Sequence, residues 1–213
     1  MLIITGYTDM MLGCQLKPAE YLARCASEFA KLDLSQSERL AEDIFNAYTN
    51  DRFVFLCGNG GSGSNCSHFC EDLGKSSLNP KDFMNDNVKR LKVLSLTDNV
   101  GWLTAVANDL DYDQVFVQQL MNYGSAGDLL LAISGSGNSA NVLNAVDWAN
   151  RHQLATFGLT GYDGGQLKQI QQDGLHLQLD DMGMVESIHL CLFHWVLNDL
   201  FARINRCGRY ADE

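Results

Sequence analysis

Four side chains in two separate segments have the chemistry of an acid–base or metal site. His68 and Asp72 lie four residues apart, a spacing that places both on one face of a helix. Glu186 and His194 lie eight residues apart in another helical stretch, about 80° apart around its axis and roughly two turns along it. Two imidazoles and two carboxylates form a reasonable zinc set, and the same groups can accept and donate protons. The spacing therefore predicts one site at which all four converge.

Two loops rich in glycine and serine offer a second kind of chemistry, the binding of a small anion. Segment 58–64 (GNGGSGS) follows an apolar run and opens a helical stretch, and segment 134–139 (SGSGNS) is built in the same way. Backbone N–H groups at a helix start and serine hydroxyls can hold an anion without lysine or arginine. We expect one sheet to carry both clusters of donors.

Other interpretations of these loops fit less well. Both satisfy the dinucleotide-binding pattern, as GNGGSG and GSGNSA, but that motif also needs an acidic residue about 20 residues on, at the end of a second strand. Segment 79–87 is polar and lacks strand character, and Asp163 lies in a glycine-rich turn. Neither loop continues into the GKS or GKT of a P-loop, so no nucleotide cofactor is expected. Tight turns without any ligand are disfavoured because both loops are rich in hydroxyls and both join a strand to a helix.

The composition indicates an acidic protein of the cytoplasm. A formal net charge of -11 repels nucleic acid, so no nucleic-acid partner is expected. No apolar run approaches the roughly 18 to 20 residues of a membrane span, and segment 1–11 lacks the pattern of a secretory signal. The seven cysteines are scattered without a CxxC pair, which predicts reduced thiols, with Cys66 and Cys70 serving in packing rather than as ligands.

The elements that must position these groups are indicated by periodicity. Helical spacing over 18–32 and 35–48, the second opened by the capping box Ser35-x-x-Glu38, predicts an N-terminal helical extension over 1–50. From 51 to 213 strands and helices alternate, which predicts a doubly wound, mostly parallel five-stranded sheet flanked by helices, an α/β fold in one domain over 1–213. The strands are expected at 53–57, 91–96, 129–133, 154–159 and 175–179, and the helices at 64–77, 99–108, 113–123, 138–152, 163–171 and 184–205.

Taken together, the motifs resemble those of the sugar isomerase (SIS) domain and, within it, the phosphoheptose isomerases. In chain order they are CGNGGS at 57–62, HFxEDL at 68–73, ND at 108–109, ISxSGNS at 133–139, LTGxDGG at 159–165, and ExIH at 186–189 followed by His194. The resemblance implies an SIS-type sheet, a homotetramer with shared sites, and a phosphate held by the three serines of the second loop. The substrate-binding set that it implies is Asn59, Gly60, Gly61, Ser62, Asn108, Asp109, Ser134, Gly135, Ser136 and Ser139.

Aldose–ketose isomerisation moves a proton between neighbouring carbons through an enediol, and it needs a base at the carbon and a donor at the oxygen. In the isomerases that the chain resembles, the position of Asp72 is usually glutamate and acts as the base, and that of Glu186 is usually glutamine. The histidine matching His194 is the acid, and zinc can bridge His68, Asp72, Glu186 and His194. This chain departs from that pattern, because Asp72 reaches roughly 1.5 Å less far than glutamate, and misplacements of about 1 Å can cost on the order of a hundredfold in rate. Glu186 brings a second carboxylate that can serve as the base or strengthen metal binding.

The sequence thus predicts a phosphoheptose-isomerase-like enzyme for a phosphorylated ketose such as sedoheptulose 7-phosphate, with Asp72, Glu186 and His194 as the catalytic set. The alternative is a non-catalytic SIS protein that senses sugar phosphates or binds proteins, like the bacterial relative that assists the replication initiator. That relative lacks the paired acidic and histidine residues, which favours catalysis here. His189 is left outside the site, because a core or interface role explains it equally well.

Overall fold

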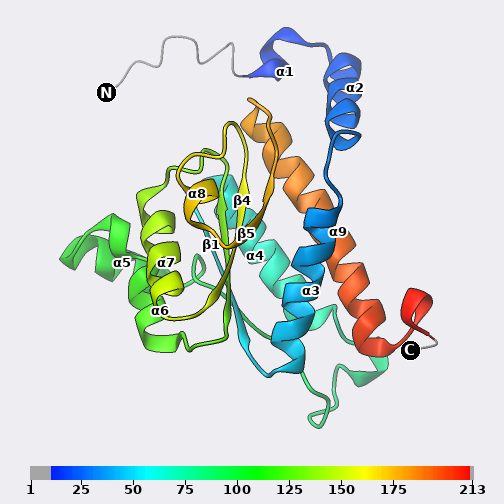
Figure 1. Cartoon of the computed structure of the whole chain (residues 1–213), viewed down its shortest axis with the longest axis vertical. Helices are drawn as coiled ribbons and strands as arrows, with labels where there is room; N and C mark the ends of the chain where they lie inside the picture. Colours follow the sequence, from blue (N-terminus) through cyan, green and yellow to red (C-terminus); the bar gives the residue numbers. More distant parts are fainter. Residues whose placement is uncertain (1–10, 212–213) are drawn as a thin grey trace.

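The fold is built on five parallel strands in the order β2-β1-β3-β4-β5 (Figure 1). The computed structural model describes residues 11–211. Parallel pairing sets Gly58 beside Ile133, and Ser134 beside Thr160, so the carboxyl ends of β1, β3 and β4 meet at one edge of the sheet. The strands are β1 Phe53–Gly58, β2 Lys92–Ser95, β3 Leu129–Ser134, β4 Ala155–Thr160 and β5 Asp173–His176.

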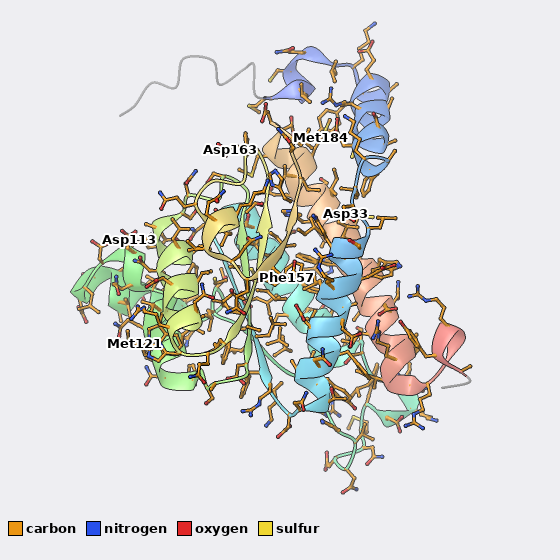
Figure 2. All side chains as sticks on the ribbon, in the orientation of Figure 1. Asp33, Asp113, Met121, Phe157, Asp163 and Met184 are labelled. Atoms are coloured by element: carbon orange, nitrogen blue, oxygen red, sulfur yellow. The ribbon has the colours of Figure 1, made fainter. Side chains whose placement is uncertain are left out.

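Helices cover both faces of this sheet, because alternate strand residues point to opposite sides. Val54 and Leu56 pack in one core cluster with α3, α4 and α9, where Phe157 of β4 is also fully buried (Figure 2). Phe55 and Cys57 pack in a second cluster against α5, α6, α7 and α8. The helices are α1 Leu12–Gln15, α2 Pro18–Phe29, α3 Ser35–Thr49, α4 Gly60–Lys75, α5 Val100–Asp109, α6 Val117–Tyr123, α7 Ala140–Arg151, α8 Leu167–Ile170 and α9 Met182–Asn205, with the 3-10 turns η2 Pro80–Asp82, η3 Tyr112–Gln114 and η4 Gly208–Tyr210.

The α/β fold and its parallel sheet are confirmed, with local corrections. The helix expected over 113–123 is split into η3 and α6, and the helix expected from residue 64 begins at Gly60. The capping box at Ser35 is wrong: Ser35 is the first residue of α3, and the carboxylate of Asp33 accepts its backbone N–H at 3.1 Å. The helix expected over 163–171 shortens to α8 because Gly164 and Gly165 adopt positive φ angles of 90° and 52°, which do not continue a helix. The last strand lies at β5 instead of 175–179.

The longest helix, α9, brings its side chains against α4. The rings of Phe69 and Phe193 stack at 4.2 Å between centroids, in the fully buried layer between the two helices. Their sequence neighbours His68 and His194 are thereby held close together on the exposed side of the same contact. None of the helices within residues 11–211 is long and apolar enough to cross a bilayer.

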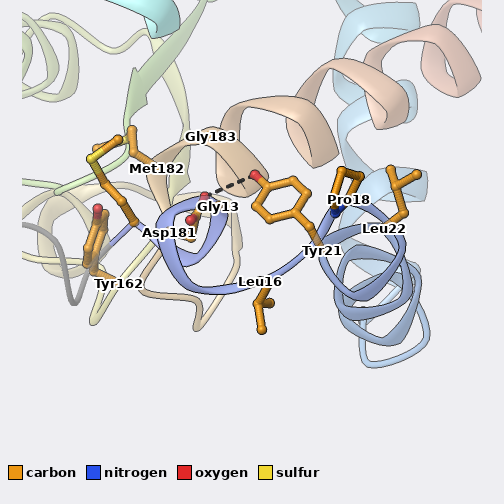
Figure 3. A pocket seen from close by; sticks show the side chains of 10 residues that line it. Gly13, Leu16, Pro18, Tyr21, Leu22, Tyr162, Asp181, Met182 and Gly183 are labelled. Atoms are coloured by element: carbon orange, nitrogen blue, oxygen red, sulfur yellow. Dashed lines mark hydrogen bonds between the residues drawn. The ribbon is translucent and has the colours of Figure 1, made fainter.

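The N-terminal arm, α1 and α2, projects at one end of the molecule and is tied to the start of α9 by a buried carboxylate (Figure 1). Asp181 caps α9 by accepting the N–H of Met184 at 2.8 Å, and it also accepts the N–H of Leu12 at 2.9 Å. The hydroxyl of Tyr21 donates to the same side chain at 3.4 Å (Figure 3). One carboxylate therefore anchors the arm and fixes the first turn of α9.

Replacing this carboxylate should loosen both elements. We expect Asp181→Ala to lower the free energy of unfolding by about 1–2 kcal/mol, the usual effect of a lost N-cap, and to expose residues 11–21 to limited proteolysis. Urea unfolding and protease mapping measure the two effects. Asp180→Ala, at the exposed neighbouring position, is the control and should change stability by less than about 0.5 kcal/mol. Equal effects of the two changes would contradict the anchoring role.

Candidate active site

The first glycine loop joins β1 to α4 and leaves amide donors at a helix start. Asn59 is the N-cap residue, and the first intrahelical backbone bond runs from the N–H of Gly63 to its carbonyl oxygen at 3.1 Å. The amides of the first turn therefore lack helical partners and are available to an anion. Gly60 has a φ of 54° and open space where a Cβ would lie, whereas a Cβ on Gly61 would meet the carboxylate oxygens of Glu186 at 2.3 Å.

The second loop joins β3 to α7 and gathers hydroxyl groups. The hydroxyl of Ser134 donates to that of Ser139, the N-cap residue of α7, at 3.2 Å. Ser136 is exposed at the tip of the loop, and its hydroxyl accepts the N–H of Asn138 at 3.3 Å. Ser136 and Asn138 also line a pocket of about 550 Å³ with Tyr162, Asp163, Asp180 and Met182.

A hydrogen-bonded pair of amide side chains connects the two loops: Asn59 belongs to the predicted substrate-binding set, whereas Asn141 was not singled out from the sequence. The amide nitrogen of Asn59 donates to Asn141 at 2.8 Å, and that of Asn141 donates back to Asn59 at 2.9 Å. The hydroxyl of Tyr112 in η3 also donates to Asn59, at 2.9 Å. Asn141 lies two residues after Ser139, next to the segment that carries the second motif, and this position was its only signal.

Three of the four predicted acid–base residues come together at the contact between α4 and α9. Nε2 of His68 lies 3.4 Å and Nε2 of His194 lies 3.9 Å from Oδ2 of Asp72. The ligand atoms of all three residues lie within 4.8 Å of one another. The Asp72 side chain is 17% exposed, whereas the two histidine side chains are 44% and 49% exposed. The carboxylate of the cluster is thus mostly buried, whereas its two imidazoles are accessible to solvent.

Glu186 does not join this cluster. It precedes His194 by eight residues on α9, which corresponds to about 12 Å along the helix axis. Its carboxylate lies against Gly61 at the start of α4, and burial raises its pKa above the ordinary value of 4.5. The structure therefore separates the two carboxylates that the spacing alone predicted to converge, and it places Glu186 beside the first loop.

The remaining singled-out residues are placed as follows. Asn108 and Asp109 are exposed at the end of α5 and hydrogen-bonded to each other at 2.7 Å. His189 is buried in the core, and the loss of solvent lowers its pKa to about 4, so its imidazole is neutral at ordinary pH. Burial raises the pKa of Cys66 well above its usual value and that of Cys70 to about 11. Both thiols are protonated and free, which agrees with the packing role expected of them.

Comparison with known proteins identifies the family. A model of the SIS domain matches residues 19–161, more than half of the chain. The chain belongs to the SIS domain family. It is 35% identical over 171 residues to a phosphoheptose isomerase of Helicobacter pylori, covering 80% of this chain and 83% of that protein. A probable phosphoheptose isomerase of Thermoplasma acidophilum is 32% identical over 177 residues, with 83% and 93% covered.

A solved structure supports the same assignment. The phosphoheptose isomerase of Neisseria gonorrhoeae superposes with a TM-score of 0.76 at 30% identity, covering 85% of this chain and 95% of that one. This SIS domain therefore shares both its fold and its recognisable sequence with phosphosugar isomerases. The resemblance inferred from the motifs is confirmed.

The geometry of this SIS domain also fits a divalent metal ion. Two imidazoles and one carboxylate, His68, His194 and Asp72, form a group of three within 4.8 Å. Three protein ligands of nitrogen and oxygen are typical of catalytic zinc sites, which keep a further coordination position open. Among the described residues this group is the one whose ligand atoms meet that spacing.

The shape of the second loop depends on Gly137. Its φ is 67°, and a Cβ there would lie 2.0 Å from the carbonyl oxygen of Gly164. We expect Gly137→Ala to lower the free energy of unfolding by about 2 kcal/mol or more, because both the backbone conformation and the neighbouring turn would have to shift. Gly60→Ala, at a positive φ of 54° but without a steric neighbour, should cost about 1 kcal/mol. Urea unfolding measures both; an effect of Gly137→Ala no larger than that of Gly60→Ala would contradict the close approach.

Proposed function

We propose that this protein is an aldose–ketose isomerase that converts sedoheptulose 7-phosphate through an enediol. The observation that carries the proposal is the cluster of three side chains at the contact of α4 with α9: His68 and Asp72 lie on the helix that the first glycine loop opens, and His194 lies on α9. The family and its phosphoheptose isomerase relatives support the same reaction class. A non-catalytic sensor of sugar phosphates is disfavoured, because acidic and imidazole groups are both present and close.

The phosphate group would bind at the second loop. The hydroxyls of Ser134 and Ser139 lie within hydrogen-bonding distance of each other, and Ser136 is exposed beside them. The N-terminal amides of α7 follow directly, so the helix dipole and the hydroxyl donors act on the same spot. This arrangement suits a protein with a net charge of -11, because the attraction is local and needs no basic patch.

We assign proton abstraction to Glu186 and proton donation to His194. Asp72 is enclosed between two imidazoles, whereas Glu186 lies apart from them with a pKa raised by burial, which brings a carboxylate closer to the pKa that a general base needs. His194 lies about two turns beyond Glu186 on α9, and its imidazole is 49% exposed and open to a substrate. A sugar that extends from the first loop along α9 would contact the base first and the acid further along the helix.

A zinc ion would be held by His68, Asp72 and His194, and when bound it would supply, in place of the proton that His194 donates in the metal-free site, a Lewis acid that polarises a substrate oxygen. In this assignment Asp72 is a ligand, which removes the difficulty of its short reach as a base. Glu186 stays outside the ligand set. Asp72 and Glu186, the two acidic residues that depart from the family pattern, would therefore have different roles, Asp72 as a metal ligand and Glu186 as the base.

The protein would work as a cytoplasmic homotetramer. The helix α5 is largely apolar yet exposed, with Val100 68% exposed at its start and Leu110 61% exposed just after its end. It projects from the side of the sheet opposite α9 (Figure 1). Docking of this helix on a second copy would bury that apolar surface and bring Asn108 and Asp109 into an interface, as expected for sites shared between subunits.

Isotope exchange tests the reaction and its base. Incubated with sedoheptulose 7-phosphate in deuterated water, the wild-type protein should form an aldose product and incorporate deuterium next to the carbonyl carbon. Glu186→Gln should lower turnover by about 10²- to 10⁴-fold, as expected for loss of a general base. Gly61→Ala, whose new Cβ would displace the Glu186 carboxylate, should lower turnover in the same direction with little change in stability.

Gly13→Ala, where the nearest atom lies at 3.8 Å, is the matched control for the added methyl group. Mass spectrometry and NMR read the exchange, and thermal unfolding reads stability. Neither exchange nor aldose product from the wild-type protein would overturn the proposed reaction. Full activity of Glu186→Gln would overturn the choice of base alone.

Metal content tests the ligand assignment separately. We expect the wild-type protein to bind one divalent ion per chain, and His68→Ala and Asp72→Asn to weaken that binding at least tenfold because each removes one of three ligands. Glu186→Gln should keep the ion. Elemental analysis and the visible absorption of the Co²⁺-substituted protein give the readout without any turnover. If Glu186→Gln loses the ion as Asp72→Asn does, Glu186 is a ligand.

A further inference from the structure

The amide pair between Asn59 and Asn141 is more constrained than a simple bridge between two loops. Asn141 is 1% exposed and lies at the start of α7, and Asn59 is the N-cap residue of α4. Their two hydrogen bonds are reciprocal, at 2.8 and 2.9 Å. Because one partner is buried, rotation of its amide group would leave a polar atom without a partner, which is costly.

The orientation of both amides follows from a backbone group that can only donate. The N–H of Val142 is shared between the backbone oxygen of Ser139 at 3.0 Å and Oδ1 of Asn141 at 2.9 Å, so the oxygen of that amide faces the backbone and also receives Nδ2 of Asn59. Nδ2 of Asn141 is then left to donate to Oδ1 of Asn59. This pattern of donors and acceptors assigns the oxygen and nitrogen positions of both side chains.

Counting donors and acceptors then shows what Asn59 has left to offer. Its Oδ1 accepts from Asn141 and from the hydroxyl of Tyr112, which uses both lone pairs. Its Nδ2 carries two protons, and one of them is used by Asn141. Among the described residues the second proton has no acceptor within hydrogen-bonding distance. Asn59 is only partly buried, so it presents one N–H donor and no acceptor to a ligand.

We propose that Asn141 and Tyr112 are positioning residues that hold Asn59 as a hydrogen-bond donor to the reacting oxygen of the sugar. This inference rests on the proposed isomerase function. Asn59 lies two residues before Gly61, against which the Glu186 carboxylate packs, so the donor and the base occupy the same helix start. When Glu186 removes a proton from carbon, negative charge develops on the neighbouring oxygen, and a donor that cannot rotate stabilises that charge without reorganisation.

The arrangement also gives Asn141 a role that spans both loops. It follows the N-cap Ser139 of the proposed phosphate site by two residues, and its side chain determines which group of the Asn59 amide, the N–H donor or the oxygen, faces the sugar. The distance between phosphate and reacting oxygen is thereby set by direct contact between the two helix starts. Only phosphorylated sugars whose carbonyl reaches Asn59 from the second loop would be turned over efficiently.

Two variants test this positioning role. Asn141→Asp keeps the shape but replaces the donor to Asn59 with an acceptor, so Asn59 should rotate and present its oxygen to the substrate. We expect kcat for sedoheptulose 7-phosphate to fall at least 30-fold while KM changes less than threefold, because phosphate binding is retained. Tyr112→Phe, at a side chain 54% exposed, should lower kcat three- to tenfold without affecting folding. Tyr123→Phe, also exposed and not bonded to Asn59, is the matched control and should be unchanged.

A double-mutant cycle separates positioning from a structural role. In an Asn59→Ala background, Asn141→Asp and Tyr112→Phe should have no further effect on kcat, since the donor that they orient is gone. Equal losses with and without Asn59, or losses confined to KM and thermal stability, would overturn the inference while the isomerase function stands. A wild-type protein without activity on the sugar phosphate would overturn the proposed function and this inference with it. If Asn141→Asp does not fold, Tyr112→Phe decides alone.

Discussion

The site depends on the parallel pairing of β1 with β3. Because these strands run side by side in the same direction, the loops that follow them leave the sheet at the same edge, and the helices α4 and α7 start next to each other. The donors proposed for the phosphate, and Asn59, lie on these two loops or their first helical turns. The amide pair of Asn59 and Asn141 is the contact that this register makes feasible.

A second consequence of this layout is that the acidic character of the chain does not prevent anion binding. The net charge of -11 belongs to the chain as a whole, whereas hydroxyl and amide dipoles act within a few ångströms of the ligand. Asp163 and Asp180 line the pocket beside Ser136, but the two carboxylates proposed for the chemistry lie away from the serine loop. Asp72 is held by two imidazoles and Glu186 lies at the first loop, so neither carboxylate opposes the phosphate at the second.

Much of this organisation could be predicted from the sequence, for physical reasons. Strands buried on both faces are apolar throughout, so β1, β3 and β4 were recognisable as short apolar runs that lead into glycine-rich loops. His68 and Asp72 are four residues apart, a spacing that places two side chains on the same face of any α-helix. The bounds of α3 were predicted to within one residue, but its capping contact was not, because Asp33 rather than Ser35 supplies the side-chain oxygen. The start of α8 was less predictable, because glycine conformations decide where that helix begins. The contacts that could not be predicted are those between residues far apart in the sequence. Helical spacing alone does not show that Glu186 packs against Gly61 while His194 lies beside Asp72. The hydrogen bonds between Asn59 and Asn141 likewise join residues 82 positions apart.

The anchoring of the N-terminal arm has a practical consequence for anyone who shortens the chain. Asp181 shares its oxygens between α9 and the backbone of Leu12, so deleting the segment before α3 would leave a buried carboxylate with fewer donors, five residues ahead of Glu186 in the sequence. A trimmed protein that retains the whole sheet would therefore have an altered first turn of α9, the helix that carries the proposed base Glu186. The arm, although remote from the chemistry in sequence, belongs to the smallest piece of this chain that preserves its site.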